Sequence, residues 1–215
     1  MFFYRNLMPR VLRYVVAILA LVVGGGYTSS AQELKLGVDF TTLFDNREYA
    51  SMSFDESGTL FSARLTPNIG IKWAEYNHLM FAADFVQDFG HKSKFLSDVN
   101  VQLYYAYRAP RVKLFAGIFP RSEMRGLQSP LFFDRDYRYY HHTIAGVLAR
   151  YESAKHSGSY VEMAMDYTGM RDKFVRESFD ITLSAYHRIK GLELGLDGMM
   201  RHYGKDLDEM TNDGV

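Results

Sequence analysis

The segment FSARLTPNIGIKW at residues 61–73 alternates apolar and polar side chains with a period of two. Such alternation predicts a β-strand with one apolar face and one polar face. As a strand the segment is roughly 40 Å long, or about 28 Å in height at a tilt of about 45°. This length matches a strand that crosses a bilayer and exceeds the usual soluble strand of about five or six residues. Pro67 cannot donate a ladder hydrogen bond, so the sequence predicts a bulge or a kink there.

Runs of the same kind continue along the chain, about nine in all after residue 31. The joints between them alternate in length: residues 45–58, 87–97, 120–142 and 169–177 are long, and residues 74–77, 109–110, 153–158 and 189–191 are short. A transmembrane β-barrel sorts its connections in this way, because every second one is a tight periplasmic turn and the others are outer loops. The sequence therefore predicts an all-β fold, an antiparallel up-and-down transmembrane β-barrel.

Residues 1–31 have the features of a cleaved signal peptide. They combine arginines before any acidic residue, an apolar run at residues 15–23, and small residues at 29–31. The apolar run is too short to cross a bilayer of about 30 Å as a helix, so an uncleaved anchor is the weaker alternative. The start of translation, Met1 or Met8, is left open. We expect export to the bacterial outer membrane, with residues 32–215 forming the barrel.

A chain of nine strands raises a question about completeness, because bacterial single-chain barrels have an even number of strands. An open sheet with two unpaired edges also cannot lie in lipid. We therefore expect these residues to be an incomplete N-terminal portion of a larger barrel, with residues 205–215 in an outer loop. The alternative is a small barrel in which residues 207–215 form a poor tenth strand.

Composition limits the partners. The chain has 25 basic and 25 acidic residues and no cysteine, which excludes a nucleic-acid-binding character, a disulfide framework and a lipid-modified cysteine. A barrel of this kind is expected to contact outer-membrane lipid and, during biogenesis, the barrel-assembly machinery. Whether it forms a homo-oligomer is left open. No cofactor motif is present, and no phosphate loop or zinc motif is found.

The polar strand faces carry many charges, which would be costly in hydrocarbon and are therefore expected to face a wet or ion-paired lumen. The candidates for lumen-facing positions are Asp39, Arg64, Lys72, Asp84, Arg108, Lys113, Arg150, Glu162, Asp166, Asp180, Glu193 and Asp197. Charges of both signs are mixed, which indicates no strong ion preference. They fit either a lined channel or a lattice of paired charges that fills a closed lumen.

The longest joint, residues 120–142, is the best candidate for a functional loop, since loops of this length in compact proteins are often functional. Its aromatic residues and arginines suit either a constriction inside a pore or an external loop that packs on itself. The constriction candidates are Phe132, Phe133, Asp134, Arg135, Arg138 and Tyr139. The adjacent His141 and His142 lack a third ligand at useful spacing, so no metal site is predicted.

These observations favour a non-enzymatic, porin-like passive channel for small polar solutes. One alternative is a barrel enzyme that hydrolyses lipids or esters, for which Ser184, His187 and His202 lie near strand ends without a motif that connects them. Another alternative is a secreted, soluble β-sandwich or a lipocalin-like binding protein.

Five segments resemble the porin-like outer-membrane barrels of Bacteroidota. They are LFDNREY at 43–49, RLTPNIG at 64–70, FAGIFPR at 115–121, RESF at 176–179 and RHYG at 201–204. The resemblance covers most of the chain after the leader, and its motifs are wall and turn segments. It implies an outer-membrane location, a barrel fold and a longer chain, and it transfers no catalytic residue.

Overall fold

The computed structural model of the chain describes residues 32–48, 58–90, 95–126, 132–133, 135–155, 158–170 and 176–204. The leader predicted for residues 1–31 and the poor tenth strand considered for residues 207–215 lie outside these ranges. No helix in the described ranges is long and apolar enough to cross a membrane.

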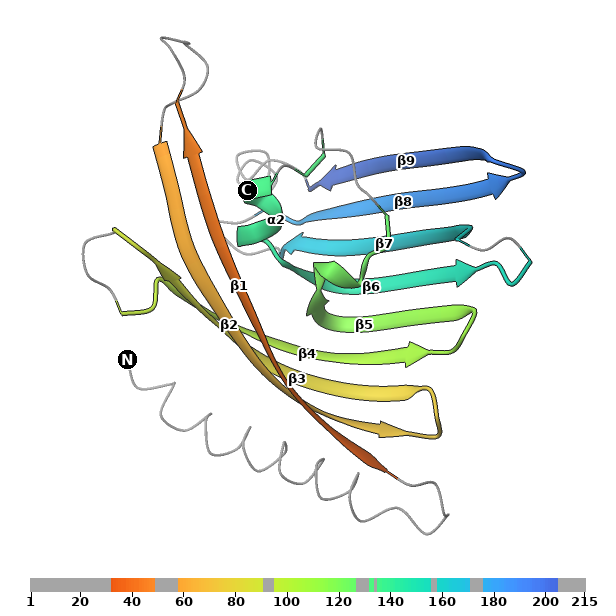
Figure 1. The fold of residues 1–215 in the computed structure, drawn as a ribbon, viewed down its shortest axis with the longest axis horizontal. Coiled ribbons are helices and arrows are strands. Elements are labelled where there is room, and N and C mark those ends of the chain that lie inside the picture. Colours follow the sequence, from red (N-terminus) through yellow and green to blue (C-terminus); the bar gives the residue numbers. More distant parts are fainter. Residues whose placement is uncertain are drawn as a thin grey trace, which may run out of the picture. The chain divides into compact units, whose positions relative to one another are not determined.

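Nine antiparallel strands form one sheet in which each strand pairs with its neighbours in sequence (Figure 1). This up-and-down order confirms the predicted all-β architecture. Within the described residues β1 and β9 form the two edges, so the sheet is not closed. The strands are β1 (Glu33–Arg47), β2 (Gly58–Trp73), β3 (Asn77–Asp88), β4 (Asp98–Arg108), β5 (Val112–Pro120), β6 (Thr143–Glu152), β7 (Tyr160–Gly169), β8 (Ser178–Ile189) and β9 (Leu192–Tyr203).

The short joints at residues 74–77 and 189–191 are tight turns, as their sequences predict. Ala74 and Glu75, between β2 and β3, have φ values of 44° and 67°, and Lys190 and Gly191, between β8 and β9, have 44° and 89°. Positive φ at both central residues matches the right-handed twist of the flanking strands in a hairpin. The strand ends that the long joints connect lie at the opposite end of the sheet (Figure 1).

Pro67 produces no bulge. The pairing of Leu65 with Phe85 and of Asn68 with Ala82 keeps the same register on either side of it, and on its other side Pro67 stands opposite Val38. The proline therefore interrupts the ladder to β3 without shifting it. The irregularity that does occur lies between Tyr167 and Gly169, where β7 pairs with β8.

One face of the sheet is apolar and exposed on most strands. Representative outward side chains are Leu36, Phe40, Leu103 and Met163, of which between half and three quarters of the surface is accessible. A continuous apolar wall of this kind would be unfavourable in water and is the surface that an outer-membrane barrel presents to lipid.

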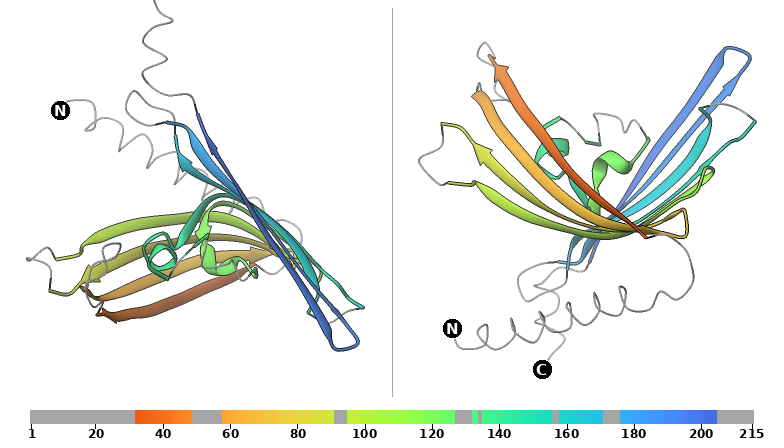
Figure 2. Two further views of the ribbon diagram at one scale, coloured as in Figure 1. Left: turned by 90° about the horizontal axis from the view of Figure 1, so that it is seen from above. Right: turned by 60° about the horizontal axis from the view of Figure 1, so that its bottom comes forward.

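The sheet is strongly curved, and two short elements, η1 (Arg121–Glu123) and α2 (Arg135–Tyr140), lie on its concave side (Figure 2). Beneath them the concave face is itself apolar on β4–β7. This inner cluster consists of Tyr104, Ala106, Phe115, Phe119, Ile144, Leu148 and Ala164. Because both faces of β5 and β6 are partly apolar, these two strands alternate less strictly in sequence than the others do.

Candidate functional site

The joint after β5 folds into the concavity of the sheet rather than away from it. We call its described parts, residues 121–126, 132–133 and 135–142, the inner segment. Its two ends are tied together, since the backbone N–H of Arg121 donates to the carbonyl oxygen of His142 at 2.6 Å. Met124 packs against the apolar cluster of the inner face. The segment therefore covers part of the concave face and has its own fixed structure.

Arg121 attaches the inner segment to β7. Its guanidinium forms an ion pair with Asp166 and donates to the carbonyl oxygens of His141 and Thr143. The same guanidinium lies over the rings of Phe133 and Tyr137, 5.0 and 5.4 Å from their centroids. Burial raises the pKa of the Tyr137 phenol, so this ring stays neutral beside the cation. One arginine thus fixes both halves of the inner segment.

Glu162 on β7 provides a second attachment. Its side chain is 1% exposed and accepts hydrogen bonds from the backbone N–H groups of Arg125 and Gly126 at 3.0–3.1 Å. Arg150 on β6 donates to the same carboxylate at 2.8 Å. A buried carboxylate is stable only when it is paired and hydrogen-bonded in this way. Glu162 therefore holds the turn that follows η1 against the wall.

The most chemically informative group of contacts surrounds Asp84 on β3. Its fully buried carboxylate accepts hydrogen bonds from Thr66 at 2.5 Å and from Gln102 at 2.9 Å. Nε2 of His142, at the end of the inner segment, lies 2.5 Å from the same carboxylate. Nδ1 of His142 is buried and has no hydrogen-bond partner among the described residues. A carboxylate that fixes one imidazole nitrogen and leaves the other as an acceptor is the arrangement of a general base and its orienting group.

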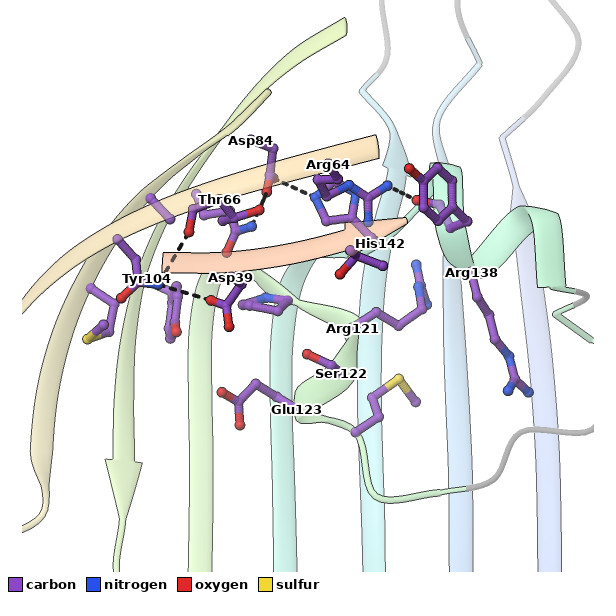
Figure 3. Close-up of a pocket in the computed structure, with 18 of the residues that line it drawn as sticks. Asp39, Arg64, Thr66, Asp84, Tyr104, Arg121, Ser122, Glu123, Arg138 and His142 are labelled. Carbon is purple, nitrogen blue, oxygen red and sulfur yellow. Dashed lines mark hydrogen bonds and ion pairs between the residues drawn. The ribbon is translucent and has the colours of Figure 1, made fainter. Parts of the chain in front are cut away.

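A cavity of about 830 Å³ lies beside this pair, between the inner segment and strands β1–β4. Figure 3 shows Asp84, His142 and Arg64 close together, with Arg121, Ser122 and Glu123 of the inner segment below them. The hydroxyl groups that line it belong to Thr41, Thr42, Thr66, Ser122, Tyr104 and Tyr139. None of the described hydroxyl groups is hydrogen-bonded to His142.

The twelve charged residues predicted to face a lumen lie on the concave face by strand alternation, in different surroundings. Five are buried: Arg64, Asp84, Glu162, Asp166 and Asp180. Four are half-buried (Lys72, Arg108, Lys113 and Arg150), and three are exposed (Asp39, Glu193 and Asp197). The structure brings Asp39, Arg64 and Asp84 together at the cavity. Ion pairs along the wall hold Lys72, Arg108, Arg150, Glu162, Asp166, Asp180 and Glu193, whereas Lys113 donates to the carbonyl oxygen of Ala109.

The constriction candidates also separate. Phe133 and Tyr139 are buried in the inner segment, whereas Phe132 and Arg138 are exposed. Arg138 and Tyr139 line the cavity. Arg135 begins α2. Asp134 and the side chain of Arg135 lie outside the described residues.

The residues considered for a hydrolytic site do not come together. Ser184 points inward and is hydrogen-bonded to Tyr160, whereas His202 is exposed and stacks on Phe179 with ring centroids 4.6 Å apart. His187 alternates with Ser184 and therefore faces outward. A different histidine, His142, has a carboxylate partner, Asp84. No group of three or more metal-ligating residues is found among the described residues, and His141 stacks on Tyr137 instead.

A family model described as Lipid A 3'-O-deacylase-type matches residues 27–214. The chain belongs to this family. Comparison with curated proteins and with solved structures gives no match. The family and the barrel-type sheet together support the outer-membrane assignment. The predicted resemblance to outer-membrane barrels is therefore supported, but a resemblance to porins in particular is not.

Family membership corrects one prediction. The chain was expected to be non-enzymatic, and this is contradicted because the family is of an enzyme type. The prediction failed because strand alternation reports the wall of a barrel and contains no information about chemistry. The sequence signal that was available was His142 at the end of the long joint, which was considered only as a metal ligand beside His141.

Proposed function

We propose that this protein is an outer-membrane deacylase that hydrolyses an acyl ester of lipid A. The family supports ester hydrolysis as the reaction class and lipid A as the substrate. The observation that carries the proposal is the buried pair of His142 and Asp84, 2.5 Å apart, at the wall of a large cavity. Thr66 and Gln102 hold the carboxylate, so the imidazole has a fixed orientation.

In this mechanism the neutral imidazole of His142 carries its proton on Nε2. The Nε2–H group donates a hydrogen bond to the carboxylate of Asp84, and the lone pair of Nδ1 acts as the base. Because no described hydroxyl group is hydrogen-bonded to His142, water is the nucleophile that the geometry supports best. Nδ1 is closed to solvent in this structure, so the step requires the imidazole to be opened toward the cavity. Nδ1 then takes a proton from water, whose oxygen adds to the acyl carbonyl carbon. Collapse of the tetrahedral intermediate breaks the ester C–O bond, and the sugar oxygen receives the proton from the imidazolium. The products are a free fatty acid and a sugar hydroxyl group.

The position of the pair suits a lipid of the outer leaflet. His142 directly precedes β6, and Asp84 lies near the end of β3, both toward the long-joint end of the sheet. In an outer-membrane barrel the long joints face outward. A substrate from the outer leaflet therefore approaches the site from the side where the inner segment enters.

Mass spectrometry of lipid A incubated with the purified protein in detergent tests this proposal. We expect loss of one acyl chain with the wild type. The variant His142→Gln should be about 100-fold slower or more, since a positioned general base contributes about 10²–10⁴ in rate. The matched control is His202→Gln, which changes an exposed histidine on the opposite face. An intact lipid A after incubation with folded wild-type protein would contradict the function. Equal rates for wild type and His142→Gln would remove His142 as the base.

The porin-like channel for small polar solutes is the less well supported proposal. It is favoured by the many charges on the concave face, but the inner segment covers that face over the apolar cluster. Export through a cleaved leader at residues 1–31, contact with outer-membrane lipid and assembly by the barrel-assembly machinery follow from the same membrane assignment.

A further inference from the structure

Arg64 differs from the other arginines of the concave face in lacking an acidic partner. The side chains of Arg108, Arg121 and Arg150 each form an ion pair, with Glu123, Asp166 and Glu162. No described carboxylate lies within ion-pair distance of Arg64, although the residue is only 8% exposed. A cation in this position is unusual, because burial of a charge without a counter-ion is costly.

The contacts that Arg64 does make leave most of its donors unused. Nη2 donates to the carbonyl oxygen of Tyr139, and the guanidinium lies 4.4 Å from the centroid of the Tyr139 ring. Nε is buried and has no hydrogen-bond partner among the described residues. Nη1 makes no hydrogen bond to a described residue either. The ring and the carbonyl oxygen therefore orient the guanidinium without neutralising it.

The place of Arg64 connects it to the proposed catalytic pair. It stands opposite Val86 in the pairing of β2 with β3, two residues from Asp84, and it lines the same cavity as His142 (Figure 3). The carboxylate of Asp84 already accepts hydrogen bonds from Thr66, Gln102 and His142, so it is committed to holding the base. An anion that enters the cavity thus meets an oriented guanidinium in the same cavity as the base.

We propose that Arg64 binds a phosphate group of the lipid substrate and so positions the ester at His142. A guanidinium presents a planar fork of donors that matches the oxygens of a phosphate. The inference rests on the proposed deacylase function and adds the residue that recognises the phosphate of the lipid. It assigns Arg64 to substrate binding and leaves the base as described above.

Two substrates with the same acyl chains test the proposal, namely lipid A that carries its phosphates and lipid A from which phosphatase has removed them. We expect the wild type to deacylate the phosphorylated lipid with a kcat/KM about ten- to hundredfold higher, the range of a charged hydrogen bond. The variant Arg64→Gln should lose this preference, because its kcat/KM for the phosphorylated lipid should fall to the value for the dephosphorylated lipid. Arg64→Lys should recover part of it. The control is Arg176→Gln, an exposed arginine that does not line the cavity.

The outcomes separate the two proposals. Equal turnover of both lipids by the wild type overturns the phosphate site and leaves the deacylase function intact, and this comparison holds even if the Arg64 variants fail to fold. Turnover of neither lipid contradicts the proposed function itself. A third measurement uses free inorganic phosphate. Suppose that phosphate raises the melting temperature of the wild type but not of Arg64→Gln, and that the wild type turns over both lipids equally. The site then binds free phosphate, and the assignment of the lipid phosphate to Arg64 is wrong.

Discussion

The concave faces of β7 and β9 have the same alternation in sequence but different environments in the structure. On β7, Glu162 is 1% exposed and is bonded to the inner segment. On β9, Glu193 and Asp197 occupy equivalent inward positions and are exposed. Among the described residues, the inner segment is attached by hydrogen bonds and an ion pair to Glu162 and Asp166 of β7, and it makes no such contact with Glu193 or Asp197 of β9. The returning segment thus organises the inward charges of β7, whereas Asp180 of β8 is held by Arg201 of the neighbouring strand.

This difference predicts where the loss of a carboxylate matters most. Glu162→Ala removes the acceptor of two backbone N–H groups of the inner segment and one acceptor of Arg150, which keeps its contacts with Glu152 and the carbonyl oxygen of Glu123. Removing one partner of a buried ion pair costs about 3–5 kcal/mol. We expect a loss of this size in the free energy of unfolding, measured by urea titration of the protein in lipid vesicles.

The matched control is Glu193→Gln, which removes an exposed carboxylate from its pair with Arg188 on the same concave face. Exposed pairs contribute little, so the unfolding curve should hardly move. Similar curves for the two variants would mean that the inner segment does not depend on its attachment to β7.

Most of the fold could be predicted from the sequence, because each strand carries its own signal. Period-two alternation located β2 and β4, and the sequences of the tight joints indicated where β2 and β8 end. These are local properties, determined by the preferences of adjacent residues and by the two-sided surroundings of a strand. The alternation was weakest at β5 and β6, where the inner segment makes the second face apolar as well.

The candidate site could not be predicted, because its contacts are not local. His142 and Asp84 are 58 residues apart and meet only because the joint after β5 turns inward. The aromatic residues of this joint fitted an inward or an outward packing equally well. What decided the direction were side chains on distant strands, such as Asp166 for Arg121, and sequence alternation gives no register between such partners.

A second comparison is between the outward, apolar face of the sheet and its concave, polar face. Leu103, near the middle of β4, is 54% exposed on the apolar face, between Phe81 and Ile118 of the neighbouring strands. Leu103→Arg would place a charge in hydrocarbon, which costs about 2–4 kcal/mol near the bilayer midplane. We expect this loss in folding free energy in lipid vesicles, and a smaller loss in detergent.

Gly195 provides the control on the inner side of β9, where an added Cβ meets no atom within 4 Å. Gly195→Arg should fold nearly as well as the wild type, because its charge faces the wet side of the sheet. If the two arginines were equally harmful, or if Leu103→Arg were the milder one, the assignment of the two faces would be reversed.

The smallest effect is expected where the concave face has no cover. Asp197 is exposed on β9 and stands opposite Ser184, away from the cavity. Asp197→Asn keeps the shape of the side chain and removes only its charge. We expect the free energy of unfolding to stay within about 0.5 kcal/mol of the wild type, as for surface substitutions in general.

The rate of lipid A deacylation should also be unchanged, because charge on the uncovered face does not act on His142. If deacylation slowed as much in Asp197→Asn as in His142→Gln, the site would extend along the concave face to β9. The contrast between β7 and β9 would then not define the limits of the site.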